Sequence, residues 1–352
     1  MKNWKRVLPP MALLIVLMLR ANVAREAAAQ AIRQAAEVVF PALFPFCVVS
    51  RCLTQSGALQ IRRGDRWSER WFGVPAVGLS AVAMGLCGGY PIGIHTACAL
   101  YRSGQLDRDT AQRLFRFCNN TGPAFFFGMV GAVLFESAVP CAVLYGIHIL
   151  SAVLTGRLVA QPAAQAPSRS AAPAPVRPEP LPETLRQSVR CVAQLCGYVV
   201  FFSVLLQLVL EPLGTIMGKA SLLPALISAF VDLPSGISAM ARIGSPAVRF
   251  LLCSGGIAWG GLCVHMQAAG LWQAVGLTAP GYYGCKLLQT LISLSLAMPA
   301  ARVLFGAALP LWPSILPFLA VFLKKALEFF PQMRYHKKKE QWRPRHAVSQ
   351  RN

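Results

Sequence analysis

Apolar positions along this chain gather in long blocks that short polar connectors separate. In chain order the blocks lie at residues 31–53, 72–101, 139–156, 190–210, 282–300 and 307–323. A run of about 20 apolar residues is long enough to cross the hydrocarbon core of a bilayer as a helix. The pattern therefore predicts an all-α polytopic membrane helix bundle with about eight to ten membrane segments.

Four breaks interrupt these apolar stretches. Break 1 (85–95) reads "GLCGGYPIGIH" and break 2 (118–124) reads "CNNTGPA". Break 3 (231–237) reads "VDLPSGI" and break 4 (259–267) reads "WGGLCVHMQ". Lipid offers no hydrogen bonds, so non-helical backbone at membrane depth survives only inside protein or against a water-filled cavity. We therefore expect broken or re-entrant helices that face something polar.

The two halves of the chain repeat this plan. Aligning "GYPIGI" with "DLPSGI" pairs Pro91 with Pro234 and Gly93 with Gly236. In each half, a second break follows the first at nearly the same distance along the chain. The sequence therefore predicts an internal duplication with two structural repeats.

Changes in composition divide the chain into five predicted regions. The start is basic with a short apolar core, but Arg20 and a poor cleavage match favour a retained helix over a signal peptide. A Pro/Ala-rich stretch between the repeats cannot bury a core and is expected to be a linker. The regions are an N-terminal membrane anchor helix (1–30), a first membrane repeat (31–160), the linker (161–184), a second membrane repeat (185–327) and a basic cytoplasmic tail (328–352).

Composition excludes an ordinary soluble protein. Hydrophobic residues make up 55% of the chain and charged residues 13%, whereas an average soluble domain is about 25% charged. The net charge of +21 comes from Lys and Arg in the connectors and tail, as the cytoplasmic bias of basic residues predicts. We expect anionic lipid at the tail (328–352) and no nucleic acid; a homo-oligomer is compatible with the sequence.

This charge pattern also predicts sidedness. It places the N-terminus, the 54–71 connector, the 102–116 helix, the linker and the tail in the cytoplasm. Simple alternation cannot satisfy all of these positions if every apolar block crosses the membrane fully. At least one broken segment is therefore expected to enter and leave by the same face, or to cross twice.

Signatures of metal binding and catalysis are missing from the sequence. The eleven cysteines include no CxxC pair and no zinc spacing, so we expect small buried apolar residues, no metal and no cofactor. HExxH, GxSxG and Walker A motifs are also absent. We expect no catalytic residues and no enzyme.

Polar residues beside the breaks are the candidate substrate-binding residues. Paired, Gly/Pro-interrupted segments in two halves point to the central site of a transporter, and half-helix N-termini there favour a polar or anionic solute. The candidates are Gly89, Tyr90, Pro91, Asn119, Asn120, Thr121, Asp232, Ser235, His265 and Gln267.

Several of these residues also have a purely structural interpretation. Asp232 is the only acidic residue between Glu211 and Glu328, and a carboxylate at membrane depth costs about 2.5–3.5 kcal/mol on insertion scales. An ion pair between Asp232 and Lys286 is one expectation, and a lysine that snorkels to an interface is the other. Asn119 and Asn120 can instead cap a helix, and His265 can be a neutral core histidine.

The breaks and their flanks resemble a known family. The strings "VVFPALFPFCVVSRCL", "GGYPIGIHTACALYRSGQLDRDTAQRLFRFCNNTGPAF" and "GGLCVHMQ" resemble the sporulation integral membrane protein family YlbJ, within a wider group that carries the nucleoside-recognition, or Gate, domain. The resemblance implies a multi-pass protein of a spore-forming bacterium, needed for heat-resistant spores, and leaves the substrate open. Its motifs fall on Gly88, Gly89, Tyr90, Pro91, Gly93, Asn119, Asn120, Gly122, Pro123, Gly260, Gly261, His265 and Gln267.

Two functions from different classes follow. In the first, the four breaks line the path of a small polar solute through a transporter or channel used in spore formation. In the second, the protein is a membrane scaffold or assembly factor for spore-envelope partners, and its exposed loops and tail carry the function. An intramembrane enzyme is a distant third.

Overall fold

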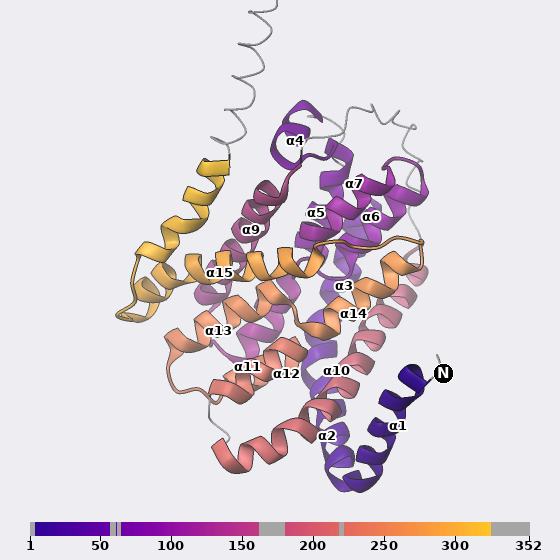
Figure 1. Ribbon diagram of the computed structural model, residues 1–352, viewed down its shortest axis with the longest axis vertical. Helices are drawn as coiled ribbons and strands as arrows, with labels where there is room; N and C mark the ends of the chain where they lie inside the picture. The colour runs from indigo at the N-terminus through magenta and orange to yellow at the C-terminus, as the bar shows by residue number, and fades with distance from the viewer. Residues whose placement is uncertain (1–3, 57–60, 62–64, 162–179, 218–221, 325–352) are drawn as a thin grey trace, which may run out of the picture.

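A computed structural model describes residues 4–56, 61, 65–161, 180–217 and 222–324. All regular structure in these ranges is helical (Figure 1), which confirms the expected all-α bundle. The region preceding residue 162 contains α1 (Trp4–Leu19), α2 (Ala21–Gln34), η1 (Ala35–Val39), α3 (Phe40–Gln55), α4 (Asp65–Phe72), α5 (Ala76–Gly88), α6 (Ile92–Arg102), α7 (Arg108–Cys118), η2 (Ala124–Val130), α8 (Gly131–Val133) and α9 (Ala138–Val159). The region following residue 179 contains α10 (Leu181–Met217), α11 (Leu222–Val231), α12 (Leu233–Met240), α13 (Pro246–Trp259), α14 (Gly261–Gln273), α15 (Tyr282–Phe305) and η3 (Trp312–Ile315).

Within these ranges, five helical segments are long and apolar enough to cross a membrane, or six if the bent pair α4–α5 counts as one span. The five are Ala21–Val49, Ala138–Val159, Leu181–Pro212, Pro246–Gln273 and Tyr282–Phe305. Four apolar helices of 10–17 residues accompany them. Full-length spans are thus fewer than the eight to ten expected segments, because several apolar blocks form helices too short to cross on their own.

The first long helical segment runs through the expected boundary at residue 30, because α2, η1 and α3 follow one another without a loop. Alanines at 27–29 and 31 favour helix on both sides of that position. A π-helical turn, η1, precedes Pro41. The backbone nitrogen of proline carries no hydrogen, so Pro41 cannot donate the usual α-helical hydrogen bond. The prolines in this block therefore modify the helix without ending it.

Apart from α1, α4, α8 and η3, the helices follow the same order in both halves. Each half begins with a long helix, continues with a pair of short helices, then a broken helix, and closes with an unbroken span. The elements of the first half are α2–α3, α5–α6, α7–η2 and α9, and those of the second are α10, α11–α12, α13–α14 and α15. This order is what an internal duplication predicts; the boundaries of the two repeats stay a prediction.

A glycine lets each short-helix pair fold back on itself. A Cβ on Gly93 in α6 would stand 3.0 Å from the Cα of Gly85 in α5. In the second half, a Cβ on Gly236 in α12 would stand 2.4 Å from the Cα of Ala229 in α11. Both pairs are therefore tight helical hairpins whose backbones touch just beyond the break, and the two glycines are those that the sequence alignment pairs.

Side chains cap several half-helices. The Asp107 carboxylate accepts a hydrogen bond from Thr110 N at 2.7 Å and begins α7, and Asp232 caps α12 in the same way. Ser137 begins α9. Such caps satisfy backbone N–H groups that the first turn of a helix leaves unpaired.

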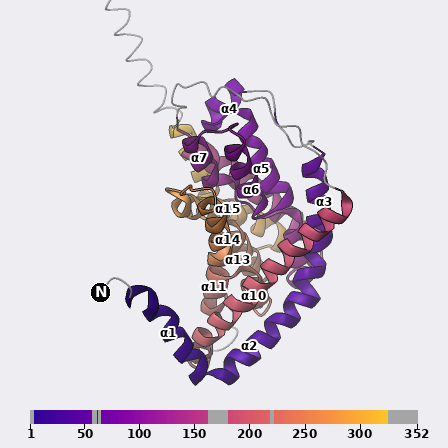
Figure 2. The same ribbon diagram turned by 90° about the vertical axis from the view of Figure 1, so that its right-hand side faces the viewer.

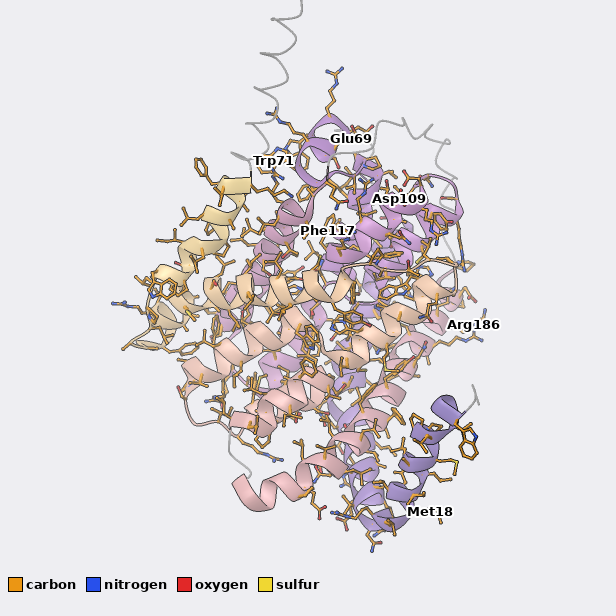
Figure 3. All side chains as sticks on the ribbon, in the orientation of Figure 1. Met18, Glu69, Trp71, Asp109, Phe117 and Arg186 are labelled. Carbon is orange, nitrogen blue, oxygen red and sulfur yellow. The ribbon has the colours of Figure 1, made fainter. Side chains whose placement is uncertain are left out.

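One end of the bundle carries segments that the charge pattern places together. Glu69 of α4 and Asp109 of α7 lie at this end, and Met18 of α1 lies at the opposite end (Figure 3). The end of α9 reaches the same place, since the carbonyl of Gln161 lies against Gly73. Helix α4, helix α7 and the end of α9 thus share one end of the bundle, and the cytoplasmic position of this end stays a prediction.

Helix α10 packs along α2 and α3 (Figure 2). Arg20 forms an ion pair with Glu211 across this seam, and Arg51 Nη1 donates to Gln187 Oε1 at 2.6 Å farther along it. The linker residues 162–179 and the tail from residue 325 lie outside the described ranges, so anionic lipid at the tail stays a prediction.

The two halves share their apolar core. Phe115 stacks on Trp272, with ring centroids 5.7 Å apart, and Phe135 packs edge-on against Phe250 at 6.2 Å. Each contact joins a residue before the linker to one after it. The halves therefore form one packed body, and the breaks lie within it.

Candidate functional site

In each half, the second break lies against the first. A Cβ on Gly122, in break 2, would stand 2.7 Å from the backbone nitrogen of Gly89, in break 1. A Cβ on Gly261, in break 4, would stand 3.1 Å from the carbonyl oxygen of Val231, at break 3. Only glycine permits such close backbone approach. The breaks thus meet in pairs.

A chain of hydrogen bonds then joins break 2 of the first half to break 4 of the second. Asn119 Nδ2 donates to the Tyr282 hydroxyl at 2.7 Å, and that oxygen lies 3.0 Å from Nδ1 of His265. All three side chains are buried. The second breaks of the two halves are therefore connected through a tyrosine on α15.

Lys286, one turn farther along α15, also binds break 2. Its Nζ donates to the backbone carbonyl of Asn119 at 3.1 Å and to Gln289 Oε1 at 2.8 Å. Gln289 Nε2 in turn donates to Asn120 Oδ1 at 3.1 Å. The lysine is 2% exposed and the glutamine 0%. Asn119 and Asn120 are thus held by α15, and the amide of Asn120 also donates to Phe117 O within its own turn.

The expected ion pair between Asp232 and Lys286 does not form. Asp232 Oδ2 accepts from the backbone N and the hydroxyl of Ser235, at 3.0 and 2.6 Å, and so serves as the cap of α12. The Ser235 hydroxyl lies 2.9 Å from the hydroxyl of Ser203 on α10. Capping directs the carboxylate along its own chain, while Lys286 points to break 2; neither side chain snorkels, since both are buried.

His148 on α9 is a participant that sequence reasoning missed. The backbone N–H of Thr121 donates to its Nε2 at 3.0 Å, and the Thr121 hydroxyl lies 3.5 Å from the carbonyl of Ile257 on α13. Because Nε2 accepts, the ring proton is on Nδ1. The isolated position of His148 in the sequence gave no signal of this contact.

Tyr282 and Gln289 were also missed, although one signal exists. They lie four residues before and three residues after Lys286 on one helix, which places all three on the same face. A polar face on an otherwise apolar span marks a surface that packs against protein.

Four buried polar atoms of this region have no hydrogen-bond partner among the described residues: Asn119 Oδ1, His148 Nδ1, Asp232 Oδ1 and His265 Nε2. Buried polar groups are normally paired with protein or water. Each of these side chains therefore retains hydrogen-bonding capacity for water or a ligand.

A cavity of about 350 Å³ lies beside breaks 1 and 2. The breaks and the first turns of α6 and η2 form one wall, and α3, α10 and α14 form the rest. Five of the predicted site residues line it, namely Gly89, Tyr90, Pro91, Thr121 and Gln267. The polar side chains of its wall are uncharged, and the N-terminus of α6 adds the positive end of a helix dipole.

The remaining predicted residues lie outside this cavity. Asn119, Asn120 and His265 belong to the buried network around α15, and Asp232 and Ser235 belong to the cap of α12. The predicted site is thus one lined cavity plus two supporting clusters. Among the described residues, no group of three or more His, Cys, Asp or Glu side chains is placed to hold a metal ion.

Comparison with known proteins yields one relative. The chain is 34% identical over 122 residues to the sporulation integral membrane protein YlbJ of Bacillus subtilis (strain 168). That relative is an integral membrane protein by name, and the present chain has five helical segments of membrane-spanning length. This chain is a multi-pass membrane protein.

The similarity is local. It covers 34% of this chain and 30% of the relative, so the match spans less than a third of that protein's length. No family profile and no solved structure matches the chain. Membership of the wider Gate-domain group, and nucleoside recognition with it, therefore stays a prediction.

Proposed function

We propose that this protein moves a small polar solute across a membrane, as a transporter or channel, through the cavity beside breaks 1 and 2. The observation that carries the proposal is the position of the cavity: interrupted helices of the first half bound it on one side, and spans of both halves bound it on the other.

The physical argument starts from the backbone. At the breaks, backbone N–H and C=O groups lose their helical partners, and at membrane depth only protein or water can satisfy them. A polar solute in the cavity offers a third kind of partner, and the N-terminus of α6 faces it with the positive end of a helix dipole. Tyr90, Thr121 and Gln267 add side-chain donors and acceptors to the same wall.

The setting is proposed from the relative. The printed name of that protein places it in sporulation. We propose that this chain acts in spore formation too. The convergence of polar groups on the protein interior supports transport over the scaffold alternative.

A two-stage experiment tests the proposal. Purified protein is first screened by thermal shift against amino acids, sugars, nucleosides and dicarboxylates, and the solute that raises Tm is then measured for uptake into proteoliposomes. We expect wild-type protein to accumulate that solute above protein-free vesicles. No shift across the panel together with no uptake would contradict the proposal.

A matched pair of variants ties uptake to the cavity. Gln267→Leu removes an amide from the cavity wall, and we expect it to abolish both the thermal shift and the uptake. Gln207→Leu makes the same change at an exposed position of α10 that does not line the cavity. Equal uptake by the two variants would place the solute path elsewhere.

A further inference from the structure

Two cysteines face each other across the seam between α3 and α10. Cys47 and Cys191 line one cavity from helices that pack against each other, near enough for their side chains to interact, and the guanidinium of Arg51 lies near both. Nearby, Arg51 Nη1 also donates to Gln187 Oε1 at 2.6 Å, which holds the two helices together at this level. The pair therefore lies in a fixed helix–helix contact.

The same two thiols line the cavity beside breaks 1 and 2. Both residues are partly exposed, so a small reagent in the cavity reaches them. Cys141 and Cys253 provide the contrast: they too lie near each other, but both are buried in the apolar core and line neither described cavity. At Cys47 and Cys191, by contrast, the two side chains lie near each other and a reagent in the cavity can reach them.

A neighbouring cation promotes reaction at such a pair. The thiolate is the reactive form of cysteine, and a nearby Arg stabilises it. A small organic disulfide is the oxidant: a first thiolate attacks one of its sulfurs and expels one thiol, and the second thiolate then attacks the mixed disulfide and expels the other. The protein loses two protons and two electrons, and one organic disulfide becomes two thiols.

We propose that Cys47 and Cys191 are a reversible disulfide site in the cavity wall, and that the bond restrains α3 against α10. Residues of both helices form the wall opposite the breaks, so a covalent link between them limits how far that wall moves. The inference does not depend on solute transport, because each measurement below uses the protein without solute.

The first measurement detects the bond. Purified protein is treated with 2-hydroxyethyl disulfide, and its free thiols are counted after unfolding by their reaction with a maleimide. We expect a lower count of reactive thiols, one bridged peptide pair containing Cys47 and Cys191, and full reversal by dithiothreitol; exposed thiols such as Cys52 are told apart by the added mass of a single 2-hydroxyethylthio group. An unchanged count, or bridges that join other cysteines, would overturn the proposal.

Variants assign the bond. Cys47→Ser and Cys191→Ser are expected to give no bridged peptide. Cys141→Ser and Cys52→Ser are expected to bridge like wild type, the first removing a core thiol and the second an exposed thiol of α3. If a variant fails to fold, the bridged peptide of the wild-type chain still decides the pairing.

The second measurement tests the restraint. We expect amide hydrogen exchange in the peptides of α3 and α10 that line the cavity to slow on oxidation and to recover on reduction, with no change in Cys191→Ser. Identical exchange in oxidised and reduced wild-type protein would overturn the claim that the bond restrains the wall.

Discussion

Lys286 places an ammonium group in the interior of a membrane protein with neutral oxygens as its hydrogen-bond acceptors. Taking a charge out of water costs several kcal/mol even after relaxation. Among the described residues no carboxylate pairs with it, and it donates to a backbone carbonyl of break 2 instead. Ionisable groups of this kind in membrane segments usually mark a functional site.

Replacing this lysine separates function from stability. Lys286→Met relieves the cost of burying the amine but leaves Asn119 O and Gln289 Oε1 without their donor, which typically costs about 1–3 kcal/mol, so we expect only a small fall in Tm. Since break 2 loses a donor, we expect uptake of the screened solute to be lost. Ser295→Ala, at a partly exposed position of the same helix, is the control for both measurements. A large fall in Tm would instead assign the lysine a structural role.

Asp232 allows a similar separation of capping from charge. Asp232→Ala removes the cap of α12, which typically costs about 1 kcal/mol, and we expect the protein to reach the membrane but to lose uptake. Asp232→Asn keeps an acceptor for Ser235 N and is expected to retain stability. If Asp232→Ala transports like wild type, the residue has no part in the solute path.

At the level of secondary structure, the two helical hairpins, α5–α6 and α11–α12, determine how the half-helices are arranged. Each turns back at a break, and each is closed by a glycine whose neighbours leave no room for a side chain. In the first hairpin the Cys118 carbonyl at the end of α7 also lies on this glycine. One glycine thus brings three half-helices together beside the cavity.

Adding one methyl group at these glycines tests the arrangement. A Cβ on Gly93 would stand 1.9 Å from Cys118 O, and one on Gly236 would stand 2.4 Å from the Cα of Ala229. We expect each Gly→Ala variant to lose about 1–3 kcal/mol of stability, the usual cost of overpacking. Gly197→Ala in α10 meets nothing within 4 Å and is expected to be neutral or slightly stabilising. Thermal unfolding in detergent is the measurement, and equal Tm values for all three variants would contradict the close approach.

At the scale of the whole molecule, sidedness follows from the packing. The α6–α7 turn lies at the same end as α4, and α9 ends beside the α4–α5 junction. The 22 residues of α9 extend about 33 Å at 1.5 Å per residue, which matches the hydrocarbon thickness of a bilayer. We therefore expect the two ends of α9 to lie at opposite faces of the membrane.

Epitope tags check this topology. We expect a tag inserted at Gly104 to be reached by antibody only from the cytoplasmic face, and a tag after Ser137, at the start of α9, only from the other face. Both positions are exposed turns, so insertion is tolerated there. Labelling of both tags from one face would show that α9 does not cross.

The tail distinguishes transport from scaffolding. Because helices α3, α10 and α14 and the breaks of the first half form the described cavity wall, we expect a chain that ends at residue 336 to keep the uptake of the full chain. Sporulation of a strain that carries this truncation is the matching measurement in cells. Loss of spore heat resistance with unchanged uptake would favour the scaffold.

Local chemistry in the sequence determined the class of the molecule and the places where its helices break. Long apolar blocks in lipid must be helical, and "GGYP", "CNNTGP" and "DLPSG" interrupt them, because glycine and proline act on the backbone of their own turn. Five of the ten predicted site residues line the cavity for that reason. A glycine pair alone is less decisive: Gly260-Gly261 lies at break 4, whereas Gly255-Gly256 is part of α13.

Tertiary packing decided which polar groups meet. Asn119 forms a hydrogen bond with Tyr282, and Asn120 forms one with Gln289, although each partner lies more than 160 residues away. Lys286 binds a backbone carbonyl, whereas the sequence suggested a carboxylate. Such pairings depend on how far each helix is rotated and shifted against its neighbours. Local patterns of apolar and polar residues do not specify those rotations, because an apolar face fits lipid and many protein surfaces equally well.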